Sequence, residues 1–182
     1  MPTIDRLLDS IRRAHDGTPW HGPSRADVLR DVTAEEAAWR PAPDAHTLWE
    51  LVLHMRSWTR EVLRRAKGEV PGDPLDGDFP AMPDVVDAAA WSEAQRSLDE
   101  SHAALVAYVV AMNDEKRASR VKPRPGEEGT RTITQRTMIR SLAEHDVYHT
   151  GQLALMKRLA RGAFGLAARD ATAVAALPPQ ES

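Results

Sequence analysis

Hydrophobic residues recur with a helical period in four long stretches of the chain. In the first stretch the apolar positions follow the spacing i, i+3, i+4, i+7, which predicts a helix over residues 3–15. These positions are Ile4, Leu7, Leu8 and Ile11. The other three stretches predict helices over residues 46–67, 88–114 and 132–161. The alternation typical of strands is missing, so the pattern predicts an all-α protein, an up-down four-helix bundle with long connecting loops.

The segments between the predicted helices are rich in proline, glycine and aspartate. Residues 69–87 form the longest of them, and we expect a long functional loop or a crossover there. Residues 117–130 predict a second polar loop, and residues 24–39 leave room for two short helical turns. The expected organisation is one helical domain over residues 1–162, followed by an alanine-rich C-terminal tail over residues 163–182.

Composition and charge narrow the classes of protein. The chain has 182 residues, 42% of them hydrophobic and 28% charged, which is typical of one globular domain. Its net charge of −3 gives no electrostatic reason to expect nucleic acid as a partner. No apolar window is long enough to span a membrane and the N-terminus lacks a signal-peptide pattern, so we expect a cytoplasmic protein without a membrane partner. The lack of cysteine means that any metal must bind to histidine, carboxylate or water.

Two histidines of the last predicted helix form the strongest candidate for chemistry. His145 and His149 are four residues apart, which places them about 40° apart on one helix face. Met138 and Met156 share this face, so we expect both imidazoles to point inward. A buried imidazole pair needs either hydrogen bonds or a metal ion, and the spacing i, i+4 is how zinc-binding helices present two nitrogens to one ion. The pair therefore predicts a metal site, with a hydrogen-bonded core pair as the alternative.

A third histidine lies on the inward stripe of the second long helix. His54 would face the pair if the two helices pack together. Three histidine ligands leave open coordination positions, as in catalytic zinc sites. Three other histidines have no partner at metal-ligand spacing, namely His15, His46 and His102. We expect them at the surface or as helix caps.

Three segments together resemble the DinB-like superfamily, which includes YfiT-like metal-dependent hydrolases and thiol-dependent S-transferases. Residues 20–24 read Trp-His-Gly-Pro-Ser, residues 46–54 read His-Thr-Leu-Trp-Glu-Leu-Val-Leu-His, and residues 145–152 read His-Asp-Val-Tyr-His-Thr-Gly-Gln. The resemblance covers residues 20 to about 157. Where many relatives have Asp-Trp-Pro, this chain has Asp78-Phe79-Pro80.

The resemblance implies an up-down bundle that holds a divalent ion, zinc or nickel. The histidines that match the metal triad of the family are His54, His145 and His149. It also implies a low-molecular-weight thiol as a possible cosubstrate. The fold and metal triad of the family carry over to this chain better than its reactions do.

Four further residues are candidates around this metal site. Glu50 precedes His54 by one turn and could orient it or act as a general base, although Thr47 and Glu50 also form a capping-box pattern at the helix start. Gln152 could hydrogen-bond a ligand or a substrate, and Trp58 could line the pocket that receives a substrate or cofactor. His21 lies in a turn that could fold over the pocket.

The sequence leaves two functions open. In the first, a three-histidine metal site activates a water for hydrolysis, or a thiol for transfer, on a small-molecule substrate. In the second, the bundle binds a small molecule or a partner without catalysis. We also expect a homodimer, because the segment from Ala163 to Leu177 adds apolar residues that one bundle cannot cover. These are Phe164, Leu166, Val174 and Leu177.

Overall fold

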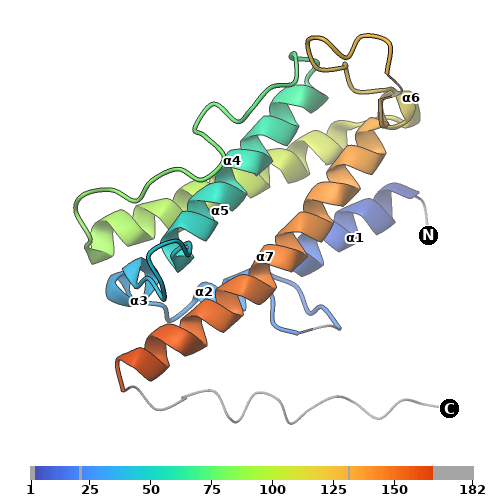
Figure 1. Ribbon diagram of the computed structural model, residues 1–182. Coiled ribbons are helices and arrows are strands. Elements are labelled where there is room, and N and C mark those ends of the chain that lie inside the picture. Colours follow the sequence, from blue (N-terminus) through green and yellow to red (C-terminus); the bar gives the residue numbers. More distant parts are fainter. Residues whose placement is uncertain (1–2, 21, 131, 166–182) are drawn as a thin grey trace, which may run out of the picture.

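A computed structural model describes residues 3–20, 22–130 and 132–165. Within these ranges the chain forms helices and no sheet, which confirms the all-α class (Figure 1). The helices are α1 (Thr3–His15), α2 (Arg25–Leu29), α3 (Ala34–Ala38), α4 (Leu48–Ala66), α5 (Ala88–Ala111), α6 (Asp114–Ala118) and α7 (Gln135–Ala163). None of them is both long and apolar enough to cross a membrane.

The ends of α4 follow from its local sequence. The Thr47 hydroxyl accepts the backbone N–H of Glu50, and the Glu50 carboxylate accepts that of Thr47, so the predicted capping box is present. Gly68 follows the last turn with a φ of +94°, a conformation that favours glycine. The helix therefore begins and ends where capping chemistry places it.

The four long helices pack side by side around a common core. Helix α4 packs against α5 and α7, and α1 packs against the same two helices. The short helices α2 and α3 contact α7 and sit near its C-terminal half (Figure 1). The two helices that carry the candidate metal ligands, α4 and α7, are thus direct neighbours.

The direction of α5 differs from simple up-down alternation. Contacts with α4 advance in the same sense along both helices, since Trp49 packs on Trp91, Arg60 donates to Ser97, and Tyr108 donates to the carbonyl of Ala66. The two helices are therefore parallel, and residues 67–87 are the crossover that returns the chain along the bundle (Figure 1). The up-down order is wrong for this pair because a connection of this length can span the whole bundle.

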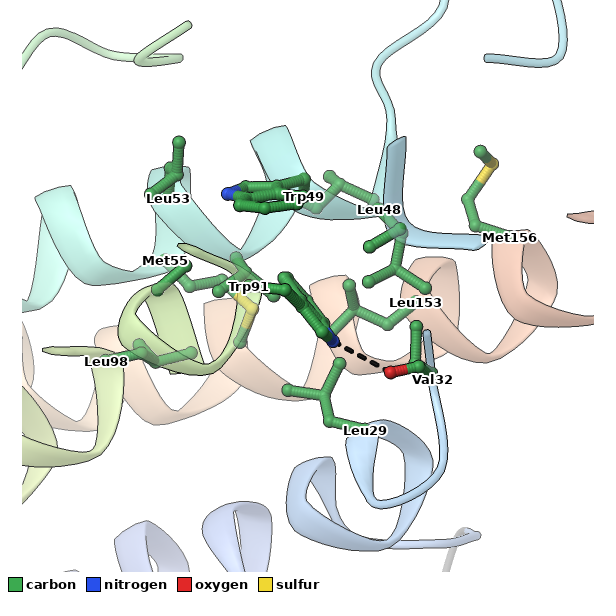
Figure 2. Close-up of a cluster of buried hydrophobic side chains, with 14 of the residues drawn as sticks. Leu29, Val32, Leu48, Trp49, Leu53, Met55, Trp91, Leu98, Leu153 and Met156 are labelled. Carbon is green, nitrogen blue, oxygen red and sulfur yellow. Dashed lines mark hydrogen bonds between the residues drawn. The ribbon is translucent and has the colours of Figure 1, made fainter. Parts of the chain in front are cut away.

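Two clusters of buried side chains form the core. The first cluster joins helices α2, α3, α4, α5 and α7. Figure 2 shows its centre, where Trp49 packs against Trp91 with ring centroids 5.1 Å apart. The indole N–H of Trp91 donates to the carbonyl of Val32 at 2.8 Å. The second cluster joins α1, α4, α5 and α7 toward the opposite end. On α7 the two histidines lie between the clusters, after Ala143 and before Leu153.

Candidate metal centre

Three imidazoles converge between α4 and α7. The Nε2 atom of His54 lies 3.0 Å from Nε2 of His145 and 3.1 Å from Nε2 of His149. One ligand atom from each ring lies within 4.8 Å of the others. Nitrogens bound to one tetrahedral zinc ion at about 2.0–2.1 Å are roughly 3.3 Å apart. The predicted triad is therefore brought together at the spacing that a shared ion requires.

The triad is buried on one side and accessible on the other. His54 and His149 are 5% and 6% exposed, whereas the His145 side chain is 28% exposed. Burial lowers the pKa of His54, and burial together with the neighbouring His145 lowers the pKa of His149 to about 4. Both rings are therefore neutral near pH 7, which is the form that binds a metal.

In two of the rings, the contact of the outer nitrogen, Nδ1, indicates which nitrogen carries the proton. Nδ1 of His54 is 2.6 Å from the backbone carbonyl of Asp78, which can only accept a hydrogen bond. Nδ1 of His149 is 2.5 Å from Oε1 of Gln152, whose Nε2 donates to the Tyr148 hydroxyl. Each ring therefore carries its proton on Nδ1. Two Nε2 lone pairs then face each other across 3.1 Å with no proton between them, and a cation resolves this repulsion.

The crossover builds one wall of the site, a feature that sequence reasoning missed. Ser57 donates to the carbonyl of Gly77 at 2.6 Å, which holds the crossover against α4. The Trp58 indole donates to the carboxylate of Asp78 at 2.7 Å, and Phe79 stacks on His54 with ring centroids 4.0 Å apart. The sequence signal that could have pointed to this region is the segment Asp78-Phe79-Pro80, which departs from the Asp-Trp-Pro of many relatives. Asp78, a residue of the crossover, thus supplies the hydrogen-bond partner of the candidate ligand His54.

The other candidate residues occupy different positions. Gln152 contacts His149, as described above, and the Trp58 ring lies 6.5 Å from the His145 ring, measured between centroids. The carboxylate oxygens of Glu50 accept from the Thr47 N–H at 2.8 Å and from Arg40 at 2.6 Å. This geometry favours the capping role of Glu50, and a role at the metal stays a prediction. His21 lies outside the residues that the structure describes.

Of the histidines expected at the surface or as helix caps, His102 is buried and His15 is half-buried. His102 is 5% exposed and packs edge-on against His15, with ring centroids 3.8 Å apart. His15 Nδ1 lies 3.0 Å from a guanidinium nitrogen of Arg25, itself 1% exposed. The surface prediction fails for this pair because α1 and α5 pack together and cover both rings. His46 is exposed, as expected, and stacks on Phe79.

Two solved structures have a fold similar to that of this chain. A DinB-like protein from Bacillus subtilis has a similar solved structure, with a TM-score of 0.56, 14% identity, and coverage of 85% of this chain and 91% of its own. A conserved protein from Enterococcus faecalis has a TM-score of 0.60 and 18% identity, over 89% of this chain and 99% of its own. At these identities the likeness shows the fold alone.

The sequence itself supplies the family assignment. No curated protein matches the chain. The model of the DinB superfamily, however, matches residues 25–153, a range that includes all three histidines and the crossover. By this match over most of its length, the chain belongs to the DinB superfamily.

Proposed function

We propose that this protein is a metal-dependent enzyme that uses His54, His145 and His149 to hold one divalent ion, zinc or nickel. The single observation that carries the proposal is the approach of the His54 and His149 Nε2 atoms to 3.1 Å, while the Nδ1 atom of each ring lies against an oxygen acceptor. Three nitrogen ligands leave open positions for a substrate, as in catalytic sites. When bound, such an ion lowers the pKa of a coordinated water or thiol, which supports either hydrolysis or thiol transfer on a small molecule.

The protein's own residues would position and protect the reacting groups. The carbonyl of Asp78 and the amide of Gln152 keep the His54 and His149 rings in the metal-binding tautomer. The half-buried Trp58 lies beside His145, the most accessible ring of the triad, and would form an apolar wall for an incoming substrate. A catalytic role for His21 remains part of the proposal, whereas the contacts of Glu50 with Thr47 and Arg40 favour a role as helix cap.

The second candidate function is a bundle that binds a small molecule or a partner without catalysis. The open side of the triad at His145 would serve a bound ligand as well as a substrate. In that function the ion would organise the site but no turnover would follow.

An activity screen of the full chain separates the two functions. We expect the zinc- or nickel-loaded protein to turn over either hydrolysable esters and amides, or an electrophile in the presence of a low-molecular-weight thiol. His149→Ala should lower that turnover at least about 100-fold, because it removes a ligand and its hydrogen-bonded support. His46→Gln, which replaces an exposed imidazole, should retain it. Stoichiometric metal without turnover in either panel would favour the non-catalytic function.

A further inference from the structure

His145 differs from the other two candidate ligands at its outer nitrogen. Its Nδ1 is buried and has no hydrogen-bond partner, whereas His54 and His149 both use theirs. The nearest carboxylate atom is Oδ1 of Asp146, at 3.6 Å. That oxygen is also buried without a hydrogen bond. A ring nitrogen and a carboxylate oxygen thus face each other, slightly too far apart for a hydrogen bond.

A buried guanidinium supports the Asp146 carboxylate from the opposite side. Nη1 of Arg25 lies 3.5 Å from Oδ2 of Asp146, and the Arg25 side chain is 1% exposed. Its Nη2 atom contacts Nδ1 of His15 at 3.0 Å, so the guanidinium is held between α1 and α7. A carboxylate that is 7% exposed needs such a charge partner to stay ionised inside the protein. Arg25 therefore places a positive charge against the carboxylate that lies next to the least anchored ring of the triad.

We propose that Asp146 is a positioning residue for His145 and that Arg25 holds it in place. When His145 binds an ion through Nε2, its Nδ1 carries the proton, and Oδ1 of Asp146 is the acceptor within reach. Shortening the contact from 3.6 Å to the usual ~2.8 Å requires a movement of less than about 1 Å. All three rings would then be oriented from outside, His54 by a carbonyl, His149 by an amide and His145 by a carboxylate. This inference rests on the proposed metal site.

Zinc affinity of the full chain tests this role. The affinity is measured by competition with a chromophoric chelator for the wild type, Asp146→Leu, Asp146→Asn and Glu144→Gln. We expect Asp146→Leu to weaken zinc binding about 10–100-fold and Asp146→Asn to recover part of the loss, because an amide oxygen still accepts from Nδ1. Glu144 is the matched control, since it precedes His145 and is exposed on the surface, where it pairs with Arg140. Its substitution should leave the affinity unchanged.

A second readout does not depend on how the variants fold. In the zinc-loaded wild type, proton NMR should show a His145 Nδ1 proton that exchanges slowly with water, as a hydrogen bond to a buried carboxylate requires. Rapid exchange of that proton, or equal zinc affinities for the wild type and a folded Asp146→Leu, would overturn the role of Asp146. Failure of the wild type to bind zinc or nickel would instead overturn the proposed metal site, and this inference with it.

Discussion

Two of the three imidazoles of the candidate centre are oriented by the groups that their outer nitrogens contact. His54 and His149 are oriented by acceptors at 2.6 and 2.5 Å, and both are buried. The sequence predicted that Gln152 could hydrogen-bond a ligand or a substrate, because it is a polar residue on the inward face of its helix. It did not predict the carbonyl of Asp78, because that contact depends on the path of the crossover and not on a side-chain type.

The contact between the half-buried His15 and the buried His102 could not be predicted from residue spacing. No periodic pattern links a residue at the end of α1 to one in the middle of α5, and each looks like an ordinary surface histidine along its own helix. Their burial follows only from the packing of the two helices. This burial has a measurable consequence for stability.

His102 should make the protein less stable in acid. Burial, together with the nearby His15 and Arg25, lowers its pKa from 6.5 to about 3. Between these values the unfolded chain binds a proton on this ring and the folded chain does not. The free energy of unfolding should therefore fall as the pH drops from 6.5 toward 3, by up to about 1.4 kcal/mol per pH unit from this group.

Urea denaturation at several pH values between 4 and 7 measures this slope. We expect His102→Gln to reduce the slope, because the group that takes up the proton on unfolding is gone. The exposed His46 offers the control, and His46→Gln should keep the wild-type slope. An unchanged slope in His102→Gln would show that His102 is not buried as a neutral ring.

For the helices, the sequence predicted their positions along the chain better than their relative directions. The apolar period placed the four long helices, and α4 begins at the capping box of Thr47 and Glu50. The predicted helix over 88–114 is interrupted, because Met112 is extended and Asn113 caps the separate α6. The parallel pairing of α4 and α5 has no signal in the apolar period, because helix direction is set by the crossover and by packing.

Substitution of Glu50 tests whether this residue acts as a helix cap or at the metal centre. Its contacts with Thr47 and Arg40 predict that Glu50→Gln lowers the free energy of unfolding by about 1 kcal/mol and leaves metal affinity unchanged. Thr47→Ala is the matched variant, because it removes the other half of the box. Thermal unfolding and a metal titration of both variants check this. A folded Glu50→Gln of normal stability that binds metal 10-fold more weakly would instead support a role at the metal.

For the whole molecule, we propose the homodimer that the apolar C-terminal residues predicted. Leu166, Val174 and Leu177 lie outside the residues that the structure describes, but Phe164 is 47% exposed at the end of α7. Leu155 on the same helix is 49% exposed. Apolar surface of this kind is common at interfaces between subunits.

Sedimentation equilibrium over a range of concentrations checks this proposal. For the wild type we expect about twice the chain mass of 20.1 kDa. Leu155→Glu should shift the measured mass toward that of a single chain. Arg158→Glu is the control, because it changes an exposed polar position of the same helix. A mass of 20.1 kDa for the wild type at every concentration would contradict the dimer.

The metal content of the protein is the direct test of whether His54, His145 and His149 bind one ion. The full chain, purified without a histidine tag and dialysed against zinc or nickel, should contain close to one ion per chain by elemental analysis. His145→Ala should lose most of it, because two nitrogens remain where three converge. Equal and negligible metal in the wild type and His145→Ala would contradict the account, and the three histidines would then be a hydrogen-bonded core cluster.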